Sequence, residues 1–171
     1  MRFISRRGVL GLVTAAGLSG LAPVRNARAA GDADDTFAGT WTYRSLLNDP
    51  DINKAFNDLK FAAATLVFVK SAFGVLTGKL SFGDDFLKLT GSASYGNPFA
   101  LRFEGVGATA GTIEDGKPWI YDYQGYLVPA WSNGVDQRPA IVGSVIRTVS
   151  HSGGQAKAGV VASFIAVRRD S

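Results

Sequence analysis

The sequence predicts an all-β fold, an eight-stranded antiparallel up-and-down barrel with one short helix after the first strand. Eight segments of strand character follow one another. Most connections between the later segments are too short for a parallel crossover, and glycine recurs inside the strands, where a closed barrel bends. A two-sheet sandwich is the alternative architecture. The barrel is favoured because hairpins between neighbouring strands dominate and no Greek-key crossing is evident.

The predicted strands have turn-forming residues at their ends and apolar residues on at least one face. They cover residues 37–47, 60–70, 73–82, 85–95, 98–108, 117–128, 139–151 and 158–168. Alternation is clear in the fifth strand, where Phe99, Leu101 and Phe103 share one face. This pattern is typical of a strand with one face in a core and the other in water.

The last two predicted strands differ, because residues 141–149 and 160–167 are apolar on both faces. We therefore expect cover on both sides, by a helix, a partner protein or a neighbouring protomer. Ser144 and Ser163 lie on these strands, and each is expected to be paired within the core or aimed at a ligand.

One short helix is predicted over residues 50–59, between the first and second strands. Asp49 is a suitable N-cap, and Pro50 occupies the first helical position, where a backbone N–H has no intrahelical partner. The apolar stripe of this helix would consist of Ile52, Ala55, Phe56 and Leu59.

Residues 1–29 are predicted to be a cleaved export signal. A basic start and an uncharged run over residues 8–24 are followed by Ala27-Arg28-Ala29, the small-x-small pattern that a signal peptidase needs. The segment 5–10, which contains Arg6 and Arg7, resembles the twin-arginine (Tat) motif, with a general secretory signal as the alternative. The resemblance implies transient binding to the Tat translocase and a periplasmic or secreted bacterial protein. No stable membrane insertion is expected after cleavage. Residues 30–36 would form a flexible lead, and residues 37–171 the barrel domain.

Composition excludes several classes of function. The 171-residue chain has no cysteine, which excludes a disulfide scaffold and a thiolate metal site, and its single histidine excludes a multi-histidine metal centre. Five of its 18 basic residues lie in the first 29 positions. The remainder has 13 basic and 14 acidic residues, a net charge of −1, so we expect no nucleic-acid partner. No phosphate-loop, dinucleotide or Gly-x-Ser-x-Gly motif is present, so no cofactor is expected.

The two ends of the predicted barrel domain carry a resemblance to a known group of proteins. Gly39-Thr40-Trp41 opens the first strand and Arg168-Arg169 closes the last. This arrangement resembles the calycin barrels, which comprise lipocalins, avidins and fatty-acid-binding proteins. The resemblance implies that Trp41 plugs one end of the barrel and that Arg168 or Arg169 covers its indole. A second element, residues 122–126, is similar to the lipocalin Asp-Tyr-x-x-Tyr element. An avidin-like or more distant barrel remains open as an alternative.

Five residues are candidates for ligand contact: Tyr123, Tyr126, Trp131, Arg138 and Arg147. The first three belong to the aromatic-rich stretch 119–131, which could grip a flat ligand, although the core face of a strand is the favoured explanation for Trp119 and Tyr121. Trp131 and Arg138 lie in the polar loop 129–138, the kind of segment in which binding residues concentrate. Arg147 lies on an otherwise apolar strand and needs a partner or a ligand, and Asp122 is the candidate partner.

His151 is the only histidine and lies at the end of the seventh predicted strand. We expect it in a surface loop rather than as a general base, because it lies between Ser150 and Ser152 with no obvious acidic partner. No residue is predicted to be catalytic or to bind a metal ion.

The sequence therefore predicts an exported barrel that binds a small apolar or aromatic ligand. The alternative is an interaction subunit or escort of another Tat-exported protein, in which the apolar last strands meet a partner or a second copy. A barrel-type cyclase or isomerase ranks third, because no paired acid and base emerges from the spacing.

Overall fold

The computed structural model describes residues 36–69, 71 and 74–169. The expected export signal over residues 1–29, including Arg6 and Arg7, lies outside the described residues, as does nearly all of the expected lead.

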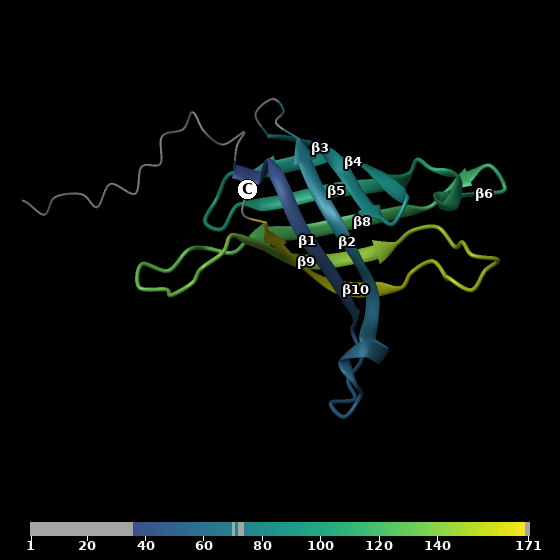
Figure 1. The fold of residues 1–171 in the computed structure, drawn as a ribbon, viewed down its shortest axis with the longest axis horizontal. Helices are drawn as coiled ribbons and strands as arrows, with labels where there is room; N and C mark the ends of the chain where they lie inside the picture. The colour runs from purple at the N-terminus through teal and green to yellow at the C-terminus, as the bar shows by residue number, and fades with distance from the viewer. Residues whose placement is uncertain (1–35, 70, 72–73, 170–171) are drawn as a thin grey trace, which may run out of the picture.

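Eight long antiparallel strands form a closed barrel (Figure 1). They are β1 (Gly39–Leu47), β2 (Lys60–Val69), β3 (Val75–Phe82), β4 (Asp85–Ser94), β5 (Ala100–Gly107), β8 (Ile120–Leu127), β9 (Ala140–Arg147) and β10 (Val161–Arg168). Each strand pairs with the next along the chain, and β10 pairs with β1 to close the barrel. A small hairpin of β6 (Ile113–Glu114) and β7 (Lys117–Pro118) lies between β5 and β8, after the short 3₁₀ helix η2 (Ala110–Thr112). The predicted all-β up-and-down barrel is confirmed, and the sandwich is excluded.

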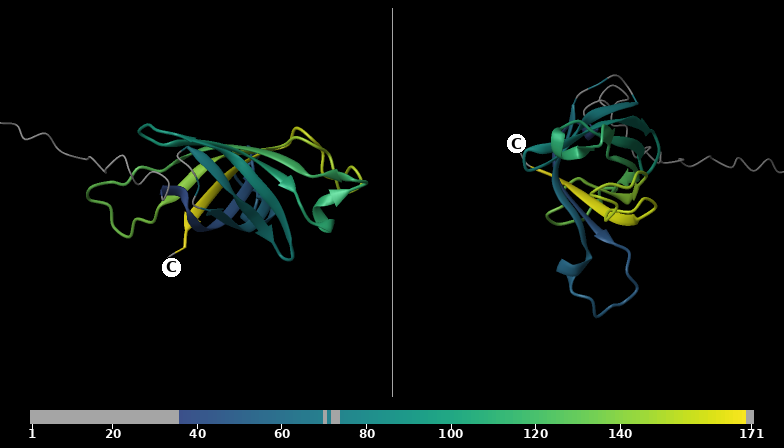
Figure 2. Two further views of the ribbon diagram at one scale, coloured as in Figure 1. Left: turned by 90° about the horizontal axis from the view of Figure 1, so that it is seen from above. Right: turned by 90° about the vertical axis from the view of Figure 1, so that its right-hand side faces the viewer.

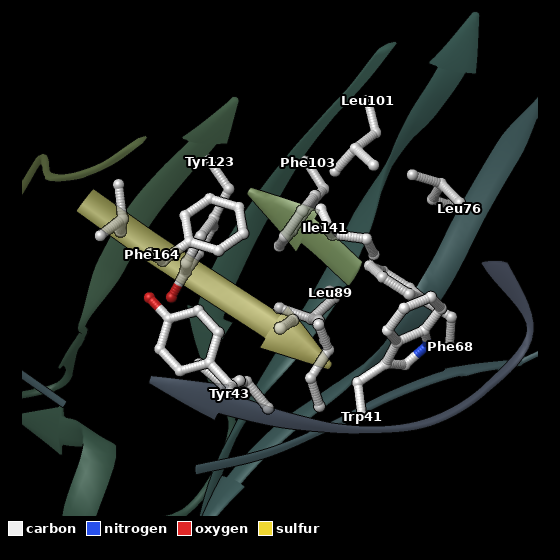
Figure 3. Close-up of a cluster of buried hydrophobic side chains, with 14 of the residues drawn as sticks. Trp41, Tyr43, Phe68, Leu76, Leu89, Leu101, Phe103, Tyr123, Ile141 and Phe164 are labelled. Atoms are coloured by element: carbon white, nitrogen blue, oxygen red, sulfur yellow. The ribbon is translucent and has the colours of Figure 1, made fainter. Parts of the chain in front are cut away.

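The inward faces of the strands follow the period-two alternation of the sequence and form one core. Trp41 and Tyr43 of β1, Phe103 of β5 and Tyr123 of β8 are all buried (Figure 3). The rings of Tyr43 and Tyr123 pack edge-to-face, and those of Phe103 and Tyr123 are stacked with centroids 4.5 Å apart. The core therefore runs through the middle of the barrel.

Glycine inside the strands lets neighbouring backbones approach closely. Gly125 of β8 pairs with Gly143 of β9, and a Cβ atom added to Gly143 would lie 2.1 Å from the carbonyl oxygen of Gln124. No other residue fits there without moving a strand, so this pair marks a place where the barrel wall can curve.

Trp41 lies fully buried near the start of β1, at one end of the barrel. Its indole Nε1 donates to the Phe37 carbonyl at 3.0 Å, and the Arg168 guanidinium lies over the ring, 4.7 Å from its centroid. Arg168 also donates to the carbonyls of Thr36 and Ala38. The structure thus has the Trp–Arg contact that the calycin resemblance implies, and Arg168 rather than Arg169 makes it.

The prediction of a helix over residues 50–59 is wrong. Only the 3₁₀ helix η1 (Phe56–Leu59) forms, at the end of a loop that extends away from the barrel (Figures 1 and 2). The Asp49 carboxylate accepts from the Asp51 backbone N–H at 3.0 Å, which makes a local turn instead of a helix cap. Ile52 is 95% exposed and Phe56 80% exposed. An isolated segment of this length does not hold a helix unless its apolar face is buried.

The outer face of the last two strands has no cover from the described part of the chain. Their inner residues, such as Ile141 and Phe164, belong to the core, whereas Val161 and Ile165 of β10 are each 43% exposed. The helix suggested as cover is therefore excluded for these residues. Ser144 and Ser163 also face outward, and Ser163 Oγ donates to Asn48 Oδ1 at 2.7 Å. Neither serine enters the core or the barrel interior.

Candidate functional site

A cavity of about 280 Å³ lies at the end of the barrel opposite Trp41. Its lining residues come from the middle of β1, the end of β3 and the first halves of β2, β4 and β8. Arg147 at the end of β9, His151 after it and Trp119 before β8 complete the wall. The lining is mostly apolar or aromatic, and its polar side chains are tyrosines, Arg147 and His151. An eight-stranded barrel has an interior just wide enough for packed side chains or one small ligand, and this chain uses one end for each.

Two buried tyrosines, Tyr43 and Tyr123, form the deep part of the cavity. Their ring centroids are 6.2 Å apart, and in Figure 3 both hydroxyls lie on the side of the cluster away from Trp41. Burial raises the pKa of both phenols, because the phenolate would lose its hydration. Both hydroxyls therefore stay neutral at physiological pH and can exchange hydrogen bonds with a bound molecule.

A stack of three rings forms one wall. Phe82 and Trp119 are parallel within 6°, with centroids 6.3 Å apart, and His151 stacks on Trp119 with centroids 3.8 Å apart. The Trp119 Nε1 atom is buried, without a hydrogen-bond partner among the described residues. Trp119 therefore contributes its ring to the cavity wall and has an N–H without a hydrogen-bond acceptor among the described residues.

His151 is buried at 7% exposure, so the expectation that it lies in a surface loop is wrong. Its Nε2 lies 2.6 Å from the Tyr121 hydroxyl oxygen, and its Nδ1 lies 2.8 Å from Ser152 Oγ. The Glu114 carboxylate accepts backbone N–H bonds from Ser152 and Gly153 and so fixes the turn that follows the histidine. Ser152 is its neighbour in sequence, but Tyr121 and Glu114 come from distant parts of the chain, which is why the local sequence does not reveal that His151 is buried.

The environment of His151 favours the neutral ring. Burial lowers the pKa of His151, and the positive charge of Arg147 lowers it further, while Glu114 opposes the shift. A neutral imidazole has one donor and one acceptor nitrogen, which suits hydrogen bonds to Tyr121 on one side and Ser152 on the other.

Arg147 lies at the end of β9 and lines the cavity. Its Nε donates to the Tyr121 hydroxyl oxygen at 3.4 Å and its Nη1 to the Lys157 carbonyl at 3.1 Å. The guanidinium carbon lies 4.9 Å from the centroid of the Phe61 ring. The side chain is thus held from three sides.

The prediction that Asp122 and Arg147 pair inside the barrel is wrong. Arg147 is opposite Tyr121 in the β8–β9 register, and Asp122 is opposite Ile146. Tyr121 and Arg147 therefore face the interior, whereas Asp122 takes the outer face of its strand. Within the described ranges the one ion pair joins Lys54 and Asp49, so Arg147 has no carboxylate partner there.

The structure brings two of the five candidate ligand residues to the cavity, Tyr123 and Arg147. Tyr126 lies on the outer side of β8 and is 43% exposed. Trp131 and Arg138 belong to the loop between β8 and β9, which lies at the plugged end, on the left in Figure 1. In an up-and-down barrel the connections before and after a strand lie at opposite ends. The aromatic residues before and after β8 therefore belong to different ends.

Phe61 is a cavity residue that the sequence does not reveal. Strict alternation with Ala62 and Ala64, which both line the cavity, would turn Phe61 outward. The pairing of β1 with β2 changes register between Ser45 and Leu46, and this irregularity lets Phe61 reach the cavity as well.

Comparisons with protein-family models, curated proteins and solved structures gave no match. Over residues 36–69, 71 and 74–169, no group of three or more Asp, Glu, His or Cys residues could hold a metal ion. In the same part of the chain, no helix is long and apolar enough to cross a membrane.

Proposed function

We propose that this protein is a binding protein that holds one small apolar or aromatic molecule in the cavity at the open end of the barrel. The observation that carries the proposal is a ring-lined cavity of about 280 Å³ in a barrel whose other end is plugged by Trp41. Small-molecule sites are typically concave and apolar, with a few polar groups that fix orientation. Arg147, Tyr121 and His151 are such groups here.

Binding is favoured over catalysis by the chemistry of the lining. None of the described residues that line the cavity is an aspartate or a glutamate, so this lining offers no carboxylate general base. Tyr121 and His151 are hydrogen-bonded to each other and are the candidate acid–base pair of the described lining. Because no carboxylate of that lining accompanies this pair, the cyclase or isomerase stays the third candidate.

A pair of variants on one strand tests the proposal. Ala64→Phe places a ring in the cavity, which has room for it, while Ala63→Phe places the same ring on the outer face of β2. We expect the Ala64 variant to weaken binding of the neutral fluorescent probe N-phenyl-1-naphthylamine at least about tenfold, because ring and probe compete for one space. Titration by fluorescence, with thermal unfolding as the folding check, makes the measurement.

The Ala63→Phe variant is the control, and it should bind the probe as the wild type does. Absence of probe binding to the wild type, or equal binding by both variants, would reject the cavity as the binding site.

The periplasm is the proposed place of action. The support is the sequence of residues 1–29 alone, with Arg6-Arg7 and the Ala27-Arg28-Ala29 pattern. A soluble carrier of small molecules is consistent with that compartment.

An interaction subunit or escort is the second candidate. It is favoured by exposed apolar side chains at two places: Val161 and Ile165 on β10, and Ile52 and Phe56 on the β1–β2 loop. Light scattering after size exclusion tests this candidate. A single-chain mass at all concentrations, with no co-purifying protein, would remove it.

A further inference from the structure

We propose that the ligand is an organic anion, with a planar apolar body in the depth of the cavity and its charged oxygens against Arg147 at the rim. This inference rests on the proposed function and names the chemical class of the ligand. Three observations carry it: the positive charge of the lining, the N–H groups of Arg147 that lack an acceptor in the described structure, and the apolar lining deeper than Arg147.

The lining of the cavity carries a positive charge. Arg147 is its cationic side chain, and none of the described residues of the lining is acidic. The nearby Glu114 uses both carboxylate oxygens to accept backbone N–H bonds from Ser152 and Gly153. A half-buried guanidinium has lost part of its hydration, so an anion that enters the cavity supplies the missing counter-charge.

The guanidinium is also held with donors to spare. A guanidinium has five N–H groups. In the described structure those of Arg147 meet two acceptors, the Tyr121 hydroxyl and the Lys157 carbonyl. The Phe61 ring supports one face of the group. A guanidinium fixed in this way can receive a carboxylate with little further loss of side-chain entropy.

The apolar part of the cavity lies deeper than Arg147. Tyr123 lies two residues further into the barrel than Tyr121, which is the cross-strand partner of Arg147. The rings of Tyr43 and Tyr123 line this deeper part, whereas the Phe82–Trp119–His151 stack lies nearer the mouth. A ligand with its ring between the deep tyrosines and the stack therefore leaves its acidic group at the level of Arg147, and ring contacts favour a planar body.

An isosteric pair of probes tests the inference: 2-naphthoate, which is an anion at pH 7.5, and 2-naphthamide, which is neutral. Isothermal titration of the purified protein should give about tenfold tighter binding of naphthoate, because its carboxylate pairs with the guanidinium charge and a neutral amide does not. Arg147→Met should abolish this preference by weakening the binding of naphthoate more than that of naphthamide. Arg44→Met, which removes an exposed cation from the outer face of β1, should leave the preference unchanged.

Salt supplies a test that needs no variant. The affinity for naphthoate should fall as sodium chloride is raised, while the affinity for naphthamide stays constant. Equal binding of the two probes by the wild type, or a preference for naphthoate that survives Arg147→Met, overturns the inference and leaves the proposed function standing. Failure of both naphthalenes and of N-phenyl-1-naphthylamine to bind overturns the proposed function and the inference together.

Discussion

Arg168 and Arg147 lie at opposite ends of the barrel and differ in their contacts. Arg168 has carbonyl oxygens and an indole face as partners, and these partners belong to the fold itself. Arg147 has donors left over and faces a cavity. A cation whose partners are supplied by the chain stabilises the folded state, whereas a cation with unsatisfied donors in a cavity is available for recognition.

The plug therefore predicts a stability difference between two adjacent residues. Arg168→Met removes the cover of Trp41 and leaves the carbonyls of Thr36 and Ala38 without their donor, so the free energy of unfolding should fall by about 2 kcal/mol. Arg169→Met removes an exposed side chain whose Nε contacts Thr42 Oγ1 at 3.3 Å, and should change it by less than about 0.5 kcal/mol. Urea unfolding of the two variants makes the comparison, and equal losses would show that Arg168 is not the lid.

At the scale of elements, contacts between β6, the turn after His151 and the start of β8 hold one wall of the cavity together. Glu114 fixes the turn after His151, and His151 in turn braces Tyr121 and Trp119. The wall is therefore assembled from three separate stretches of chain. Because His151 lies at the centre of these contacts, protonation of its imidazole should affect the whole wall.

This arrangement predicts a pH dependence of stability. The folded protein holds the pKa of His151 below its ordinary value of 6.5, through burial and then Arg147, against the weaker opposing effect of Glu114. The unfolded chain therefore takes up a proton first as the pH falls, and stability is lost below the ordinary pKa of histidine. The melting temperature of the wild type should fall more between pH 8 and pH 6 than that of His151→Gln, since carboxylates titrate lower. Parallel falls in the two proteins would contradict a neutral, buried His151.

The strands were predictable from the sequence, whereas the helix between the first two strands was predicted wrongly. In strands such as β5, buried apolar residues alternate with exposed residues, and this local pattern is enough to predict the strand. The segment 50–59 has an equally local helical pattern, but no core surface meets Ile52 or Phe56, and the pattern alone does not form a helix.

The site was partly predictable for the same reason. Tyr123 and Arg147 follow from inward positions on predicted strands, whereas Phe61 depends on a register shift and His151 on partners distant in sequence. Trp131 was misleading, because an aromatic residue in a polar loop suggests a binding mouth, and only the strand order places that loop at the plugged end.

At the scale of the whole molecule, architecture and proposed export are compatible. The chain has no cysteine, so the barrel needs no oxidising compartment to mature. The pairing of β1 with β10 joins the two ends of the described chain and needs no disulfide. A barrel closed in this way has no free sheet edge, which is compatible with the proposed export of a folded chain.

The final prediction concerns the route of export. Because the Tat pathway reads the paired arginines, Arg6→Lys together with Arg7→Lys should leave the full chain unprocessed in the cytoplasm of a Tat-competent bacterium. Arg2→Lys, which keeps the pair, should be exported and cleaved after Ala29 as the wild type is. Fractionation and intact mass measurement distinguish the products. A general secretory signal needs a positive start but not arginine itself, so continued export of the double variant would assign the chain to that route.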